Sequence, residues 1–199
     1  MTQTPARWRI ASARTMYDNP WIRVREYEAL APTGAPARYG LVEMKNLSTG
    51  VLPVESDGTT YLVGQDRFAF GRYSWELPEG GGPKESDPKA AAARELAEET
   101  GVQAASWLTL MEDVHLSNSV TDERAFAFLA WGLSPIVGVD KDAVEDLALR
   151  RLPFGEALRM AADGEISDVF SLVMLFKTNH LLQSGALPSD VADALKRGL

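Results

Sequence analysis

Apolar and polar residues alternate along much of the first fifty positions of the chain. Residues 21–30 follow this period-two pattern, and residues 39–44 repeat it after a turn-forming segment, Pro32-Thr33-Gly34. Alternation of this kind is typical of β-strands, because successive side chains of a strand point to opposite faces. We therefore expect residues 1–47 to form an N-terminal β extension packed beside a main domain at residues 48–199.

Two apolar runs, at residues 51–54 and 60–64, flank the dipeptide Asp57-Gly58. An Asp-Gly pair between apolar runs is typical of tight hairpins, so we expect these two strands to pair. The glycine-rich segment Pro78–Pro83 predicts a loop. Further strands are expected at residues 106–110, 125–132 and 148–152.

The clearest helical pattern covers residues 88–100. Asp87 suits the N-cap, Pro88 suits the first helical position, and Gly101 is expected to end the helix. Two more helices, near residues 154–162 and 167–183, are expected to close the chain. Together these elements predict an α+β protein, an α/β/α sandwich in which helices flank a mixed β-sheet.

Composition narrows the possible functions. The chain has 28 acidic and 20 basic residues, a net charge of −8, which disfavours a nucleic-acid polymer as partner. It has no cysteine, so disulfides, Cys-ligated zinc and a thiol nucleophile are excluded. No apolar run approaches the ~20 residues that span a bilayer, and no secretory apolar core is present, so we expect no membrane partner and a cytoplasmic location.

The most informative residues are three glutamates in the 88–100 helix. At 100° per residue, Glu98 and Glu99 lie about 60° and 40° on either side of Glu95, so the three carboxylates share one stripe. Arg94 is placed to pair with Glu98 at i,i+4. Hard oxygen ligands on one face suit Mg²⁺ or Mn²⁺, which bridge to substrate phosphates. A solvated acidic surface is the alternative explanation for such a stripe.

Gly80 and the run Arg94–Val102 (RELAEETGV) together resemble the signature box of the Nudix hydrolase family, including the spacing between Gly80 and Arg94. One position departs from that pattern: Ser86 stands where the family has a glutamate, with an acidic residue on either side. The segment Trp75–Gly81 and further segments after the box resemble the ADP-ribose pyrophosphatase branch.

The resemblance implies a Nudix fold over residues 48–199 and Mg²⁺-dependent hydrolysis of a nucleoside diphosphate linked to a sugar, such as ADP-ribose to AMP and ribose 5-phosphate. It also implies a homodimer, with the N-terminal β extension at the interface. Arg94 corresponds to the family's orienting arginine. The implied metal ligands are the side chains of Glu95, Glu98 and Glu99 and the backbone carbonyl of Glu79.

Other candidates have weaker signals. In this branch the general base often lies on an acidic loop after the box, here Asp140–Asp146, and Glu145 is our choice. Arg67 and Arg72 are candidate phosphate clamps, because a guanidinium fork matches phosphate oxygens. Three aromatic residues are candidates for stacking on a base or sugar: Trp21, Tyr27 and Trp75. Packing in the core is the alternative explanation for each of them.

Three functions stay open on the sequence. The leading one is hydrolysis of a nucleotide sugar. A hydrolase of other nucleoside diphosphate derivatives, of nucleotide-pool or dinucleoside polyphosphate type, is the second, and a Nudix-like sensor that binds without hydrolysing is the third. The complete Arg94–Val102 run argues against lost catalysis. The box specifies neither the nucleotide sugar nor Mg²⁺ over Mn²⁺.

Overall fold

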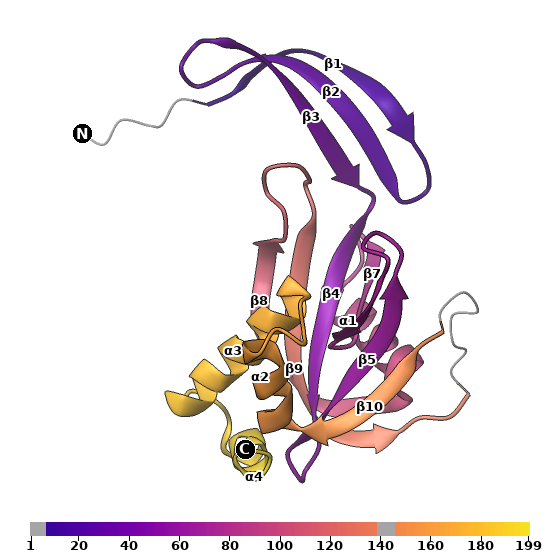
Figure 1. The fold of residues 1–199 in the computed structure, drawn as a ribbon, viewed down its shortest axis with the longest axis vertical. Helices are drawn as coiled ribbons and strands as arrows, with labels where there is room; N and C mark the ends of the chain where they lie inside the picture. The colour runs from indigo at the N-terminus through magenta and orange to yellow at the C-terminus, as the bar shows by residue number, and fades with distance from the viewer. Residues whose placement is uncertain (1–6, 139–145) are drawn as a thin grey trace.

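A computed structural model describes residues 7–138 and 146–199. Within these residues, the first three strands form a sheet of their own, and seven strands and four helices form the body (Figure 1). In chain order the elements are β1 (Arg9–Asp18), β2 (Ile22–Leu30), β3 (Pro36–Met44), β4 (Asn46–Val54), β5 (Thr59–Arg67), β6 (Arg72–Glu76), β7 (Glu79–Pro83), α1 (Pro88–Thr100), β8 (Val102–His115), β9 (Arg124–Pro135), β10 (Ala148–Pro153), α2 (Phe154–Ala162), α3 (Val169–Gln183) and α4 (Ser189–Arg197).

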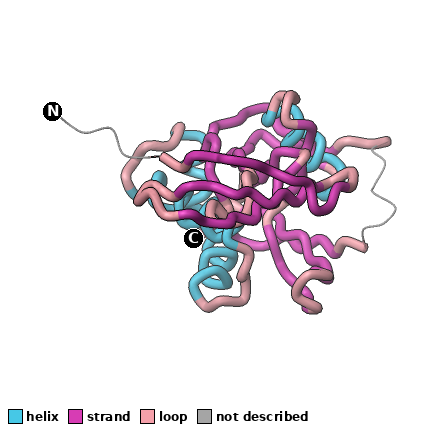
Figure 2. The backbone as a smooth tube through the Cα atoms, turned by 90° about the horizontal axis from the view of Figure 1, so that it is seen from above, coloured by secondary structure: helices cyan, strands magenta, loops and turns pink. Residues whose placement is uncertain are grey.

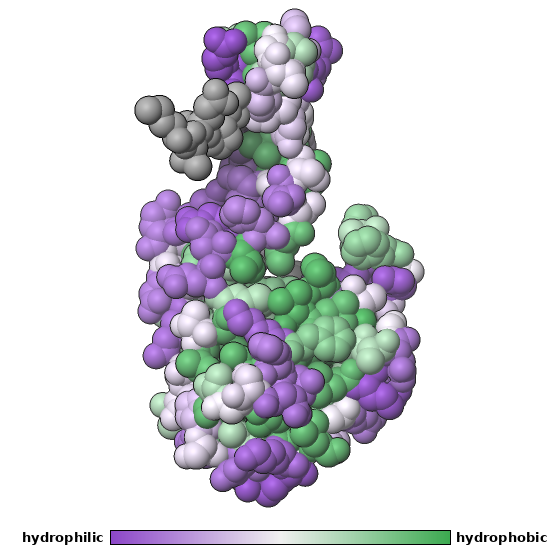
Figure 3. Space-filling view, turned by 90° about the vertical axis from the view of Figure 1, so that its left-hand side faces the viewer, coloured by the Kyte–Doolittle hydropathy of each residue, from purple (hydrophilic) through white to green (hydrophobic). Residues whose placement is uncertain are grey.

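The N-terminal sheet is an antiparallel meander in the order β1-β2-β3. It projects from the body, and Figure 3 shows it as a thin layer beyond the bulkier core. Strand β3 joins it to the connection between β8 and β9: the Val42 amide donates to the Val120 carbonyl at 2.9 Å, and the Met44 amide donates to Asp122 Oδ1 at 2.7 Å. The expected N-terminal strands are therefore present, and β1 is exposed along its whole length.

The body contains two sheets, a mixed one in the order β7-β4-β9-β8 and an antiparallel one in the order β10-β5-β6. Leu96 of α1 packs with Val51 and Phe128 on one side of the strands. On the other side, Leu129 and Met174 belong to the larger core that α2, α3 and α4 complete. Figure 2 shows helices on two opposite sides of these strands. The expected α+β fold with helices flanking a mixed sheet is confirmed.

The prediction of a hairpin around Asp57-Gly58 is correct for the turn but wrong for the pairing of the two flanking strands. The turn exists, with Gly58 at φ +84° and its amide donating to the Glu55 carbonyl at 2.9 Å. The two strands then separate, because β4 pairs with β7 and β9 whereas β5 pairs with β6 and β10. Glycine is also required at 58 by packing, since a Cβ there would lie 2.2 Å from the Ala194 carbonyl oxygen.

Two further differences concern element type. The glycine-rich segment expected as a loop contains strand β7, which pairs with β4 from Asn46↔Pro83 to Gly50↔Glu79. Helix α4 was not expected; its Val191, Ala194 and Leu195 are buried against the body. No helix in the described residues is long and apolar enough to cross a membrane.

Candidate active site

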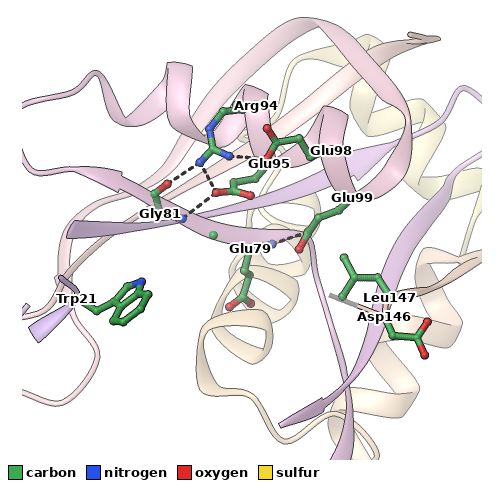
Figure 4. A pocket seen from close by; sticks show the side chains of 10 residues that line it. Trp21, Glu79, Gly81, Arg94, Glu95, Glu98, Glu99, Asp146 and Leu147 are labelled. Atoms are coloured by element: carbon green, nitrogen blue, oxygen red, sulfur yellow. Dashed lines mark hydrogen bonds and ion pairs between the residues drawn. The ribbon is translucent and has the colours of Figure 1, made fainter. Parts of the chain in front are cut away.

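The predicted glutamates of α1 border a cavity of about 540 Å³ between α1 and the start of β7 (Figure 4). Helix α1 begins and ends as expected: the Asp87 side chain accepts the Lys89 amide, and Gly101 takes the left-handed conformation at φ +72°. The cavity is lined by Trp21, Glu79, Gly80, Gly81, Arg94, Glu95, Glu98, Glu99, Asp146 and Leu147.

Arg94 organises two of the carboxylates. Its guanidinium donates to Glu98, as the i,i+4 spacing predicts, and to Glu95 Oε1 at 2.5 Å. A third bond, 2.7 Å long, runs to the Gly81 carbonyl and ties the arginine to β7. One cation therefore offsets part of the repulsion between neighbouring carboxylates and restricts their orientation.

The backbone of β7 supplies the other contacts. The Gly81 amide donates to Glu95 Oε1 at 3.0 Å, and the Glu79 amide donates to Glu99 Oε2 at 3.1 Å. Between them, a Cβ on Gly80 would lie 2.0 Å from the carboxyl carbon of Glu95. Only glycine at position 80 allows this close approach of strand and carboxylate.

The charges of this cavity suit a divalent cation. Burial raises the pKa of Glu95, and Arg94 partly opposes that shift. Glu99 is only 7% exposed. Within residues 7–138 and 146–199, no three acidic or histidine side chains are already arranged to hold a metal ion. The donor chemistry still fits Mg²⁺ or Mn²⁺, because three glutamates offer hard oxygens beside one cavity.

Comparison with known proteins identifies the family. A family model described as the NUDIX domain matches residues 44–182, more than two thirds of the chain. The chain belongs to the Nudix hydrolase family. This finding confirms the resemblance read from Gly80 and the Arg94–Val102 run.

Named relatives of this Nudix hydrolase include two kinds of pyrophosphatase. An ADP-ribose pyrophosphatase of Mycobacterium tuberculosis is 28% identical over 183 residues, covering 89% of this chain and 86% of the relative. A GDP-mannose pyrophosphatase of Klebsiella pneumoniae is 29% identical over 182 residues, covering 85% and 90%. A crystal structure of an ADP compounds hydrolase has the same fold, with a TM-score of 0.82, 18% identity and coverage of 92% and 98%.

The departure at Ser86 has a local structural role. The Ser86 hydroxyl donates to the Pro83 carbonyl at 2.6 Å and closes the turn between β7 and α1. Asp87 is used as the cap of α1, and Glu85 is exposed. None of these three residues lines the cavity of the Nudix glutamates.

The two candidate phosphate clamps lie on a different cavity of about 710 Å³. Arg67 Nε donates to the two carboxylate oxygens of Glu76 at 2.9 and 3.1 Å, and Glu76 is only 3% exposed. Arg72 donates to the Ser167 hydroxyl at 2.9 Å. The structure therefore does not bring either guanidinium to the α1 carboxylates, and the proximity of Glu76 raises the pKa of Arg67.

The three aromatic candidates lie in different parts of the structure. Trp21 lines the carboxylate cavity and is 67% exposed. Tyr27 lies on a third cavity of about 380 Å³ on the N-terminal sheet, where its hydroxyl donates to Glu43 at 2.8 Å. Trp75 packs edge-on against Tyr73 beside the main core, as the packing alternative predicts.

The sequence analysis did not single out two residues at or near this site, Asp146 and Ser171. Glu145, our choice of general base, lies outside the described residues, whereas its neighbour Asp146 lines the cavity. The acidic run 140–146 contained the signal but did not distinguish its members. Ser171, which contacts Glu79, gave no signal, because a serine inside an apolar helix is not distinctive.

Proposed function

We propose that this Nudix hydrolase cleaves the diphosphate bond of a nucleoside diphosphate linked to a sugar, with ADP-ribose yielding AMP and ribose 5-phosphate. It acts in the cytoplasm with Mg²⁺ or Mn²⁺. The observation that carries the proposal is the convergence of Glu95, Glu98 and Glu99 with Arg94 on one cavity. The names of the relatives support the substrate class, and they cover both ADP-ribose and GDP-mannose.

In this proposal the side chains of Glu95, Glu98 and Glu99 and the carbonyl of Glu79 hold the cation. When bound, the cation neutralises diphosphate charge and lowers the pKa of the attacking water. Arg94 orients Glu95 and Glu98 through its hydrogen bonds, and the β7 amides hold Glu95 and Glu99. The exposed ring of Trp21 offers a stacking surface for a base or sugar at the wall of the cavity.

A proton acceptor is supplied by the segment after β9. Glu145 keeps that role as a prediction, and Asp146 is the second candidate because its side chain lines the same cavity. Glu145→Gln and Asp146→Asn separate the two: the acceptor's variant lowers kcat by about 10²-fold or more, with little change in KM. Equal, small effects of both substitutions would show that neither carboxylate accepts the proton.

A substrate panel tests the function. ADP-ribose, GDP-mannose and a dinucleoside polyphosphate are incubated with the protein and either Mg²⁺ or Mn²⁺, and products are identified by mass. We expect AMP and ribose 5-phosphate from ADP-ribose, and no reaction when the metal is chelated. Preferential cleavage of the dinucleoside polyphosphate favours the second function. Binding of ADP-ribose without products from any compound favours the sensor.

A homodimer completes the proposal, with the extension formed by residues 1–47 at the interface. Strand β1 is an exposed edge of its sheet and carries Ile10 at 65% exposure, which supports a partner on this face. Light scattering should give twice the 21.7 kDa chain mass. Ile10→Glu should lower that mass, whereas Val137→Glu, at an exposed site outside the extension, should not.

A further inference from the structure

Ser171 is a buried hydroxyl whose two hydrogen bonds both go to the turn between β6 and β7. Its Oγ accepts the Leu77 amide at 2.8 Å and donates to Glu79 Oε1 at 2.7 Å. The side chain is 0% exposed, at the N-terminal end of α3. One hydroxyl therefore fixes the backbone before the turn and the side chain after it.

The position of Ser171 is itself fixed. Asp168 is the N-cap of α3 and accepts the Ser171 amide at 2.6 Å. Because α3 packs into the main core through Phe170 and Met174, this end of the helix is a rigid support. Movement of the β6–β7 turn relative to the core would have to break hydrogen bonds to Ser171.

Strand β7, which begins directly after this turn, carries the amides that hold the carboxylates. The side chain of Glu79 accepts the hydrogen bond from Ser171 of α3, and its backbone amide donates to Glu99 Oε2. Figure 4 shows the Glu79 carboxyl group pointing away from the α1 glutamates. Two residues later the Gly81 amide holds Glu95. Burial, followed by the nearby charge of Asp168, raises the pKa of Glu79 well above its ordinary value, which favours a neutral group there.

We propose that Ser171 is a positioning residue for the metal-binding carboxylates: by anchoring Leu77 and Glu79 to α3, it sets the position of the β7 amides that orient Glu95 and Glu99. This inference rests on the proposed function for the identity of those ligands. Ser171 itself lines none of the cavity. Its effect passes through the backbone of β7.

The test compares two buried hydroxyls on α3. Ser171→Ala removes the anchor, while Thr178→Val is the matched control, because Thr178 is also 0% exposed and its hydroxyl has no hydrogen-bond partner among the described residues. Mn²⁺ binding is measured by the electron paramagnetic resonance of free Mn²⁺, with a melting curve for each protein. We expect Ser171→Ala to weaken Mn²⁺ binding about tenfold and to raise the Mg²⁺ needed for half-maximal turnover similarly. Thr178→Val should change neither.

Several outcomes would overturn the inference. A folded Ser171→Ala protein with wild-type Mn²⁺ affinity would do so, as would failure of the wild type to bind Mn²⁺. If Ser171→Ala does not fold, Glu79→Ala removes the other half of the contact and should weaken Mn²⁺ binding by a similar factor; unchanged binding would count against the proposal. Mn²⁺ binding that depends on Ser171, in a protein that hydrolyses none of the panel, would refute the proposed function while supporting the anchor.

Discussion

Substituting Gly80 with alanine puts a single methyl group against the carboxylate array. An ideal Cβ at this position lies 2.0 Å from the carboxyl carbon of Glu95 and 2.1 and 2.5 Å from its two oxygens. Ordinary contact begins at 3.4 Å, so the group must retreat by about 1.4 Å. Retreat on that scale breaks the 3.0 Å bond from the Gly81 amide and the 2.5 Å contact with Arg94.

The expected loss is larger in rate than in stability. A misplacement of about 1 Å at a catalytic group costs on the order of 10²-fold, or about 2.7 kcal/mol of transition-state stabilisation. The lost bond from the Gly81 amide to a charged acceptor is worth about 1.5–3 kcal/mol of stability. Alanine recovers about 0.5–1 kcal/mol of that by reducing unfolded-state entropy. Gly80→Ala should therefore fold, with kcat/KM for ADP-ribose reduced about 100-fold.

The assay couples AMP release to phosphate detection at saturating Mg²⁺, alongside a thermal melt. Gly40→Ala is the matched control, because Gly40 also lies in a strand and a Cβ there meets nothing within 4 Å. The control should keep wild-type turnover. A Gly80→Ala enzyme within about threefold of wild type would refute the claim that β7 and Glu95 must approach this closely.

Three further predictions follow from other contacts. Glu99→Gln should reduce turnover by about 10²–10³-fold with the fold intact, because the amide oxygen still accepts the Glu79 amide but is a poor Mg²⁺ ligand; turnover and circular dichroism check this. Ser86→Ala should leave turnover within about twofold and cost about 0.5–1.5 kcal/mol in a denaturant titration, since it loses only the bond to Pro83. Burial and Glu55 raise the pKa of Tyr61 to about 12 from 10.0, so the folded protein retains a proton that the unfolded chain loses. Stability should accordingly fall by about 2–3 kcal/mol as pH rises from 10 to 12, and Tyr61→Phe should remove that slope in denaturant titrations.

The part of the site that could be predicted from sequence is the part encoded by neighbours along one helix. The bounds of α1 follow from Asp87, Pro88 and Gly101, and helical geometry then brings Glu95, Glu98 and Glu99 to one side. The pairing of Arg94 with Glu98 is likewise a local property of i,i+4 spacing. Each of these inferences depends on no more than the fifteen consecutive residues from Asp87 to Gly101.

The part that could not be predicted depends on which strands become partners. Glycines at 80–82 are typical of a turn, yet this segment forms strand β7 by pairing with β4. The missing side chain at Gly80 also lets the backbone of β7 approach Glu95 of α1 closely. Asp57-Gly58 makes the expected turn but cannot specify whether the flanking strands stay together. Arg67 looks like a free cation in sequence, and its tie to Glu76 appears only once β5 and β6 pair.

The contacts around α1 also explain why the glycine-rich strand β7, rather than additional arginine or lysine side chains, holds the glutamates of this helix. Three neighbouring glutamates repel one another, and a second arginine would compensate them but would compete with a divalent cation for the same oxygens. Backbone amides orient a carboxylate through one lone pair and leave its other oxygen sites available. Glu79 and Gly81 provide such amides, and the absent side chain at Gly80 lets them reach the helix. At Glu95 and Glu98, a cation would therefore compete mainly with the ion pairs of Arg94, whose side chain is 49% exposed.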